Sequence, residues 1–131
     1  MLYMPKFNKK ALIVEDDEQL RGVMVSKLGE VYEVLQAGDG EEAVERIIDK
    51  IPDVILLDLL LPKLDGFKVL DRLRSYPDKK IASIPVVVLS NLWSDKDILQ
   101  AKSLKVEEYF VKAHTDLNDV VLRLKKILEA A

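Results

Sequence analysis

The stretch DVILLDLLLP, residues 53–62, places one acidic residue, Asp58, inside an almost unbroken apolar run. A short apolar run without polar alternation is typical of a central parallel strand that is covered on both faces. An isolated buried carboxylate costs several kcal/mol or becomes protonated, so a sequence rarely places one there without a partner. Asp58 therefore needs a cation, a strand end, or both.

Apolar runs of strand length alternate with helix-period segments along the rest of the chain, which favours a parallel sheet built from βαβ units. The sequence predicts five strands, at residues 11–15, 31–37, 53–58, 84–90 and 107–112. Five helices are predicted to follow them. Their limits are set by Gly29 after the first, Asp39 and Pro52 around the second, Asp65 before the third, Ser94 before a fourth at about 95–104, and Thr115 at the start of the last. Residues 75–83 are expected to form a polar connection.

The composition bounds the class of protein. The chain has 131 residues, of which 49% are hydrophobic, and this suffices for one domain with a single core. We expect a domain over residues 1–131, with its core at about 10–130 and an N-terminal extension at 1–9. A net charge of -3 gives no broad basic field for nucleic acid. With no cysteine, signal peptide or bilayer-spanning run, a soluble cytoplasmic protein without membrane contact is predicted.

Polar residues fall where the predicted strands end. Glu15 and Asp16 end the first strand, Asp58 the third, Ser90 the fourth and Lys112 the fifth. In open α/β sheets, ligands bind outside the carboxyl ends of the strands. These five residues are therefore expected to line one pocket.

The three carboxylates of that pocket would repel one another unless a cation lay among them. Oxygen ligands without His or Cys suit a hard ion, so Mg²⁺ is predicted, with Mn²⁺ as an alternative. Asp58 could attack an in-line phosphoryl group while the metal and Lys112 neutralise its oxygens. The Ser90 hydroxyl could then donate a hydrogen bond to the new acyl phosphate, which would act as a switch.

Four motifs resemble those of the response-regulator receiver domain of two-component signalling, over nearly the whole chain. They are LIVEDD at 12–17, DVILLDLLLPKLDGF at 53–67, PVVVLSN at 85–91 and EYFVK at 108–112. The resemblance implies a flavodoxin-like doubly wound α/β fold, a five-stranded parallel sheet of order 2-1-3-4-5 with five helices. It also implies site roles, which are Asp58 as phosphoacceptor, Asp16 as direct metal ligand, Glu15 as ligand through water, the Leu60 carbonyl as metal ligand, Pro62 and Gly66 as shapers of the loop, Ser90 as switch hydroxyl, Tyr109 as switch aromatic and Lys112 as the family's lysine.

The same resemblance implies a signalling phosphoprotein rather than an enzyme, one that assists its own phosphorylation and dephosphorylation. A sensor histidine kinase or phosphotransfer protein would donate the phosphoryl group in a phosphorelay. The surface formed by the predicted fourth helix, fifth strand and fifth helix would then control a protein partner or output domain, without direct nucleic acid contact. Whether the chain is a stand-alone receiver or a domain of a longer protein stays open.

Three departures from the family pattern affect the expected site. Ala113 follows Lys112 where the family has a cis proline, so the bond is either cis at a cost of about 2.5 to 4 kcal/mol or trans. Lys105 stands where glycine is favoured. Leu60 and Leu92 occupy positions where many relatives carry polar side chains that handle the hydrolytic water, which predicts slow autodephosphorylation.

Three other functions stay open. A phosphatase of the haloacid-dehalogenase type would need an acid at Leu60, and a flavin-binding module would need a phosphate-cradling loop where EDDEQLRG stands. A pseudo-receiver would keep the fold without phosphorylation.

Five side chains also keep plainer interpretations. Tyr109 is either a switch or a strand residue half covered by the last helix, and Trp93 is either an exposed loop aromatic or part of a partner surface. Asp17 and Glu18 are expected to begin the first helix. His114 receives no role.

Overall fold

The computed structural model describes residues 8–130. It contains one five-stranded parallel sheet of order β2-β1-β3-β4-β5, which confirms the predicted topology. The strands are β1 (Lys10–Val14), β2 (Glu33–Ala37), β3 (Val54–Leu57), β4 (Val86–Ser90) and β5 (Glu108–Val111).

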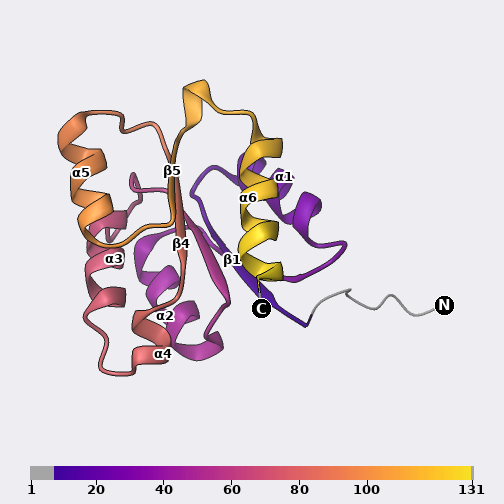
Figure 1. The fold of residues 1–131 in the computed structure, drawn as a ribbon, viewed down its shortest axis with the longest axis horizontal. Coiled ribbons are helices and arrows are strands. Elements are labelled where there is room, and N and C mark those ends of the chain that lie inside the picture. Colours follow the sequence, from indigo (N-terminus) through magenta and orange to yellow (C-terminus); the bar gives the residue numbers. More distant parts are fainter. Residues whose placement is uncertain (1–7, 131) are drawn as a thin grey trace.

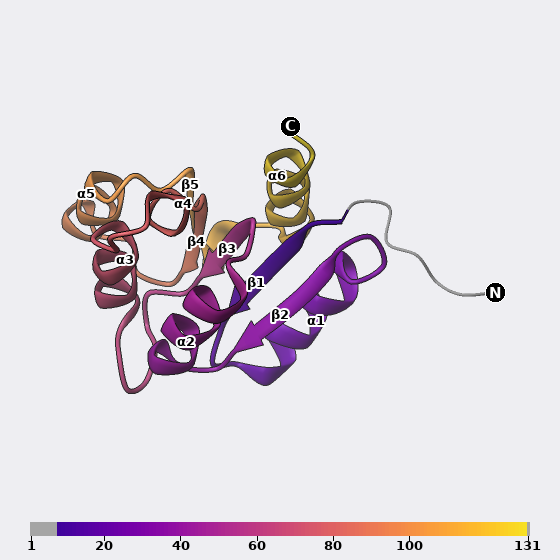
Figure 2. The same cartoon turned by 90° about the horizontal axis from the view of Figure 1, so that it is seen from below.

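Helices cover both faces of this sheet, as Figures 1 and 2 show from two directions. One face carries α1 (Glu18–Leu28) and α6 (Leu117–Glu129). The other carries α2 (Gly40–Lys50), α3 (Gly66–Arg74), the short α4 (Lys79–Ala82) and α5 (Asp95–Ser103). A single turn of 3-10 helix, η1 (Lys112–His114), follows β5. None of the helices within residues 8–130 is long and apolar enough to cross a bilayer.

The three central strands supply both hydrophobic cores because their side chains alternate between the faces. On β3, Ile55 and Leu57 pack toward α2 and α3, whereas Val54 and Leu56 pack toward α1 and α6. All residues of β3 and β4 are buried, as expected of strands covered on both sides. Asp58 therefore follows a strand that is buried on both faces.

The helix starts follow the capping residues that the sequence indicated, except the last. Asp17, Asp39, Asp65 and Ser94 each accept a hydrogen bond from a backbone N–H in the first turn of the following helix. The prediction that Thr115 begins the last helix was wrong, because Asp116 caps α6. The Thr115 hydroxyl instead donates to the Val111 carbonyl at 2.6 Å, which leaves it no part in the cap.

Other boundaries also differ from the predicted ones. The second strand begins at Glu33 rather than 31, and the fifth spans 108–111 rather than 107–112. Within the predicted polar connection, Asp78 caps α4, whose Ile81 is buried in the core. Leu99 of α5 is 67% exposed. Only Ala101 of α5 is fully buried, so this helix packs against the core through a narrow apolar face.

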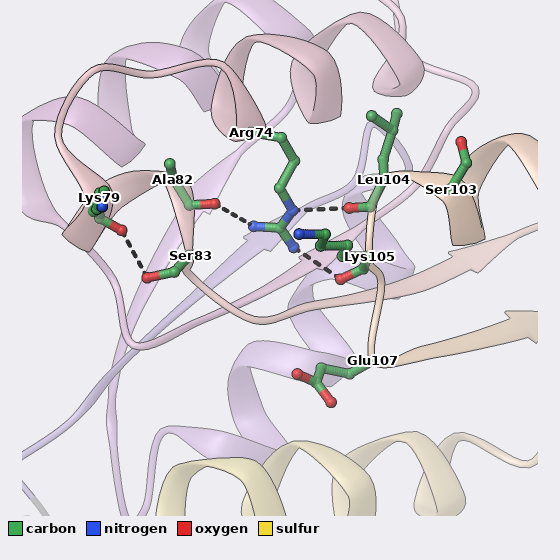
Figure 3. A pocket seen from close by; sticks show the side chains of 8 residues that line it. All are labelled: Arg74, Lys79, Ala82, Ser83, Ser103, Leu104, Lys105 and Glu107. Atoms are coloured by element: carbon green, nitrogen blue, oxygen red, sulfur yellow. Dashed lines mark hydrogen bonds between the residues drawn. The ribbon is translucent and has the colours of Figure 1, made fainter.

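Arg74 joins three segments at the amino-terminal side of β4 and β5. Its guanidinium donates to the carbonyls of Leu104 at 2.8 Å, Ala82 at 3.0 Å and Lys105 at 3.1 Å (Figure 3). It also donates to the Ile84 carbonyl at 2.7 Å. These bonds hold the end of α3 to both the α4–β4 connection and the α5–β5 turn. Arg74 and the residues around it line a cavity of about 660 Å³. Burial lowers the pKa of Arg74, while the nearby Glu107 opposes that effect.

The α5–β5 turn closes with a lysine in the left-handed region, since Lys105 has φ 60. Its N–H donates to the Lys102 carbonyl at 3.0 Å, and its side chain is exposed. The left-handed conformation costs a non-glycine residue about 1–2 kcal/mol, whereas glycine adopts it freely at an entropic cost of about 0.5–1 kcal/mol.

We therefore expect Lys105→Gly to raise the free energy of unfolding by about 0.5 kcal/mol, as measured by denaturant unfolding. The matched control is Lys102→Gly in the last turn of α5, where helical φ makes glycine unfavourable by up to about 1 kcal/mol. Equal effects of the two substitutions would show that the left-handed turn carries no strain.

Candidate functional site

Two acidic residues lie side by side because the strands before them are paired. Val14 at the end of β1 faces Leu57 at the end of β3. The backbone N–H of Asp58 donates to the Val14 carbonyl at 3.1 Å, and the N–H of Glu15 donates to the Ala37 carbonyl at 3.0 Å. The continued ladder fixes both acids at the carboxyl edge of the sheet, the expected place for a site.

Lys112 lies between these two acids. Its ammonium is 2.7 Å from Glu15 Oε1 and 2.8 Å from Asp58 Oδ2. Glu15 is 4% exposed and Asp58 is 3% exposed, so both carboxylates are removed from solvent. The remaining oxygens also have donors, since Asp58 Oδ1 accepts from the Leu60 N–H at 3.0 Å and Glu15 Oε2 accepts from the Asp17 N–H at 3.1 Å. The predicted partner of Asp58 is therefore present, at a strand end.

The pKa values of Glu15 and Lys112 reflect this crowding. Burial raises the pKa of Glu15, and the hydrogen bonds from Lys112 and Asp17 only partly oppose it. Burial alone would lower the pKa of Lys112, but its hydrogen bonds to Asp58 and Glu15 outweigh burial, so its pKa is raised. One cation thus balances two buried carboxylates, and the burial cost of Glu15 is not fully recovered.

Asp16 completes a group that could hold a metal ion. One carboxylate oxygen from each of Glu15, Asp16 and Asp58 lies within 4.8 Å of the others. Asp16 is exposed, which leaves one side of the group open to solvent. An all-oxygen donor set of this kind fits Mg²⁺, which takes one or two carboxylates and keeps several waters. The acids predicted as metal ligands are thus brought together.

Ser90 is the last residue of β4, the strand that pairs with β3, and it is fully buried. Its hydroxyl oxygen accepts a hydrogen bond from the Leu92 N–H at 3.3 Å. The Tyr109 hydroxyl donates to the Leu92 carbonyl at 2.7 Å. Ser90 and Tyr109 are therefore connected through the backbone of one loop residue, a link that the sequence did not reveal.

Tyr109 packs on the face of the sheet that carries α2, α3 and α5, and not on the α6 face that its interpretation as an ordinary strand residue required. That interpretation placed it under the last helix, but Tyr109 belongs to the core beneath α2, α3 and α5, and Phe110 is the β5 residue that packs toward α6. The correction follows from strand alternation, which sends neighbouring side chains to opposite faces. Burial first, and then the charges of Asp97 and Asp58, raise the pKa of Tyr109.

The remaining sequence candidates lie around this pocket rather than in it. Asp17 caps α1 by accepting from the Gln19 and Leu20 N–H groups, as expected. His114 is exposed, and Trp93 is 74% exposed. No peptide bond between residues 8 and 130 is cis, so the bond between Lys112 and Ala113 is trans.

Two residues at the site were missed in the sequence. Arg21 donates to the Glu15 carbonyl at 2.7 Å and to the Gln36 side chain at 3.2 Å, which holds the strand end. Its position one helical turn after the cap Asp17 could have suggested that it points back to this edge. Gly40 approaches the loop after Asp58 so closely that no side chain fits, and no local pattern signals that contact.

Taken together, the fold and the site define a doubly wound α/β protein with an acidic pocket and one lysine at the carboxyl edge of its sheet. The family model for the response regulator receiver domain matches residues 11–125. The chain belongs to this family. Receiver domains of response regulators are signalling proteins rather than enzymes in the ordinary sense, and the acidic pocket fits a phosphoacceptor site.

Relatives with known names or structures extend this finding. The DNA-binding regulator RpaA of Synechocystis is 34% identical over 120 residues, which cover 91% of this chain and 48% of the relative. The phosphorylated cyanobacterial phytochrome response regulator RcpA is 32% identical with a TM-score of 0.79, covering 94% of this chain and 95% of that one. The Mn²⁺-bound response regulator Rcp1 is 30% identical with a TM-score of 0.77, covering 94% and 96%. The chain spans about half the length of the curated relatives it matches first.

Proposed function

We propose that this chain is a phosphoacceptor receiver domain that takes a phosphoryl group from a histidine kinase, or from a phosphotransfer protein, onto Asp58. The observation that carries the proposal is Lys112, whose ammonium lies 2.8 Å from Asp58 Oδ2 and 2.7 Å from Glu15 Oε1. A buried carboxylate with a cation on one oxygen and a backbone N–H on the other is held in one orientation. Such positioning is the main contribution a protein makes to phosphoryl transfer.

In the transfer step, one Asp58 oxygen forms a bond to phosphorus as the N–P bond of the donor's phosphohistidine breaks. The electron pair stays on the donor imidazole, which takes a proton from solvent. Lys112 would then neutralise negative charge on the phosphoryl oxygens, since its ammonium already contacts the attacking carboxylate.

Asp16, Asp58 and the Leu60 carbonyl would hold Mg²⁺ directly, with Mn²⁺ as an alternative, and Glu15 would act through water. When bound, the ion would neutralise charge on the transferred phosphoryl group. The clustering of the three carboxylates and the exposure of Asp16 support this assignment.

The phosphorylated state would be read through the loop after β4. The Ser90 hydroxyl would donate to the new phosphoryl oxygens, and this would draw on the loop whose Leu92 carbonyl accepts from Tyr109. Tyr109 would then change its place and alter the surface of α5, β5 and α6. The thin apolar face of α5, with Ala101 as its one fully buried residue, supports a movable element.

This surface would control a protein partner or an output domain, and the domain would contact neither nucleic acid nor membrane itself. We place the receiver domain at residues 1–131 with its core at about 10–130, and we propose a cytoplasmic setting for the phosphorelay. The proposed partner on the input side is a sensor histidine kinase.

The test is intact-mass measurement after incubation with acetyl phosphate and Mg²⁺. We expect one phosphoryl adduct on the wild type and none on Asp58→Asn, which keeps the shape of the side chain but lacks the nucleophile. Asp53→Asn, in an exposed acid just before β3, is the matched control and should be modified like the wild type. An unmodified wild type would identify a pseudo-receiver.

Slow autodephosphorylation is a further expected property, because two leucines stand where water would be oriented. Leu60 is 51% exposed and Leu92 is half-buried, and neither can hydrogen bond an attacking water. We expect Leu60→Gln to speed the decay of the acyl phosphate by about tenfold, well short of the roughly 10²–10⁴-fold given by a positioned general base.

The decay is followed by mass after removal of the phosphodonor. Leu122→Gln is the control, since Leu122 is 54% exposed on α6, away from the pocket. A phosphoryl lifetime of seconds in the wild type would contradict the expectation.

A further inference from the structure

We propose that Gly40 is a positioning residue for the phosphoacceptor loop, residues 59–65, and that its missing side chain sets the place of the Leu60 backbone beside Asp58. The proposal rests on the proposed function, because it assigns Gly40 a part in metal binding and phosphoryl transfer. Gly40 is the first residue of α2 and is buried.

The need for glycine here is steric. Gly40 does not have positive φ, so another residue could adopt its backbone conformation. A Cβ at this position would overlap the Leu64 carbonyl oxygen and would lie 2.6 Å from the Leu64 carbonyl carbon. Real Cβ atoms essentially never approach within 3.0 Å, and the two nearest obstructing atoms are backbone, so the loop itself would have to move.

Two polar interactions also hold the start of α2 against the loop. The Gly40 N–H donates to the Pro62 carbonyl at 3.3 Å, and Lys63 lies 3.5 Å from the carboxylate of the neighbouring Asp39. Lys63 itself has φ 68, a conformation that a non-glycine residue keeps only when its surroundings hold it. The start of α2 therefore fixes the middle of the loop.

The start of the loop is joined to the site by short bonds. The Leu60 N–H donates to Asp58 Oδ1 at 3.0 Å, and the Gly66 N–H donates to the Leu59 carbonyl at 2.9 Å. The Leu64 N–H donates to the Pro62 carbonyl at 2.8 Å. Because the loop is short and held at both ends, a displacement at Leu64 must be absorbed between Leu59 and Pro62. The segment that absorbs it includes the Leu60 carbonyl proposed as a metal ligand.

The test compares Gly40→Ala with two controls. Gly22→Ala lies within α1, where an added Cβ meets nothing within 4 Å, and Leu128→Ala removes a core side chain of α6 far from the loop. Two readouts are used, namely Mn²⁺ or Mg²⁺ affinity measured by isothermal titration calorimetry, and amide hydrogen exchange of residues 59–66 in the metal-free protein. We expect Gly40→Ala to bind the ion about tenfold more weakly and to exchange the Leu60 and Gly66 amides faster.

The controls separate positioning from loss of stability. Leu128→Ala should lower thermal stability while leaving ion affinity and loop exchange unchanged, and Gly22→Ala should leave both unchanged. If Gly40→Ala binds the ion as tightly as the wild type, or no more weakly than Leu128→Ala does, the positioning role is refuted.

A milder variant keeps the test decisive if Gly40→Ala does not fold. Lys63→Gln removes the ion pair to Asp39 at an exposed side chain, and we expect about threefold faster exchange at Leu64 and Gly66. If amide exchange at Leu64 and Gly66 is unchanged in Lys63→Gln, the proposal that the start of α2 fixes the loop is refuted. Phosphorylation of the wild type is measured in parallel, since its absence would count against the proposed function while the exchange results still judge Gly40.

Discussion

Replacing Lys112 with methionine is expected to lower the free energy of unfolding by about 3 kcal/mol at pH 7 in metal-free solution. The ammonium of Lys112 contacts Glu15 and Asp58, which are 4% and 3% exposed. Methionine keeps most of the apolar stem but leaves two buried carboxylates facing each other without a cation. Removing one partner of a buried ion pair costs more than the pair contributed, because the charge that remains is uncompensated. Denaturant unfolding measures the difference.

The loss of stability in Lys112→Met should be smaller at low pH and smaller when Mg²⁺ is added. The folded-state pKa of Glu15 is raised above 4.5, so the stability linked to its protonation is present below pH 4.5 and is lost as pH rises through the folded value. The Lys112→Met variant should therefore unfold less easily at pH 4.5 than at pH 7. Added Mg²⁺ should also restore part of the stability, since binding to the folded state stabilises it.

Two comparisons make this prediction specific. Lys126→Met, at an exposed position of α6, should change the unfolding free energy by less than about 0.5 kcal/mol. In the wild type the raised pKa of Lys112 predicts the same direction in an alkaline window, with its contribution complete below pH 10.5 and lost as pH rises through the folded value. A Lys112→Met variant as stable as the wild type at pH 7 without metal would show that the two acids do not depend on this lysine.

The residues at the centre of the pocket could be predicted because each ends a strand. Asp58 follows an apolar run, Glu15 and Lys112 follow two other strands, and the rule that parallel strands end at one edge brings them together without any knowledge of side-chain positions. Ser90 is found in the same way. The strand order itself came from the family resemblance, and the sheet confirms it.

Other features depend on contacts that no local pattern encodes. The link from Tyr109 to the Leu92 carbonyl spans 17 residues and uses a backbone acceptor, which every residue carries. Gly40 resembles any glycine at a helix start until the loop that packs against it is known. Thr115 and Asp116 are both good caps, and the choice between them was made by η1, whose end draws the Thr115 hydroxyl to Val111.

Arg74 is the clearest case of such a contact, and it leads to the second large expected effect. Replacing Arg74 with methionine should lower the free energy of unfolding by about 3 kcal/mol. The guanidinium makes four hydrogen bonds to backbone carbonyls, at 2.7 to 3.1 Å, and joins α3 to segments 8 and 30 residues away. Hydrogen bonds from a charged donor contribute about 1.5–3 kcal/mol each. Water in the adjoining cavity can satisfy some of the freed carbonyls, which keeps the total below the sum.

Two variants test the geometry of this contact against its charge. Arg72→Met removes an exposed arginine from the same helix and should have little effect. Arg74→Lys keeps the charge but cannot present the planar fork that reaches both the Ala82 and Leu104 carbonyls, so it should recover only a minor part of the loss. Amide exchange should rise most at residues 104–107, where the α5–β5 turn would lose its anchor. Full recovery in Arg74→Lys would show that a positive charge near these helix ends is sufficient, and that the fork of bonds to four carbonyls is not what holds the two segments together.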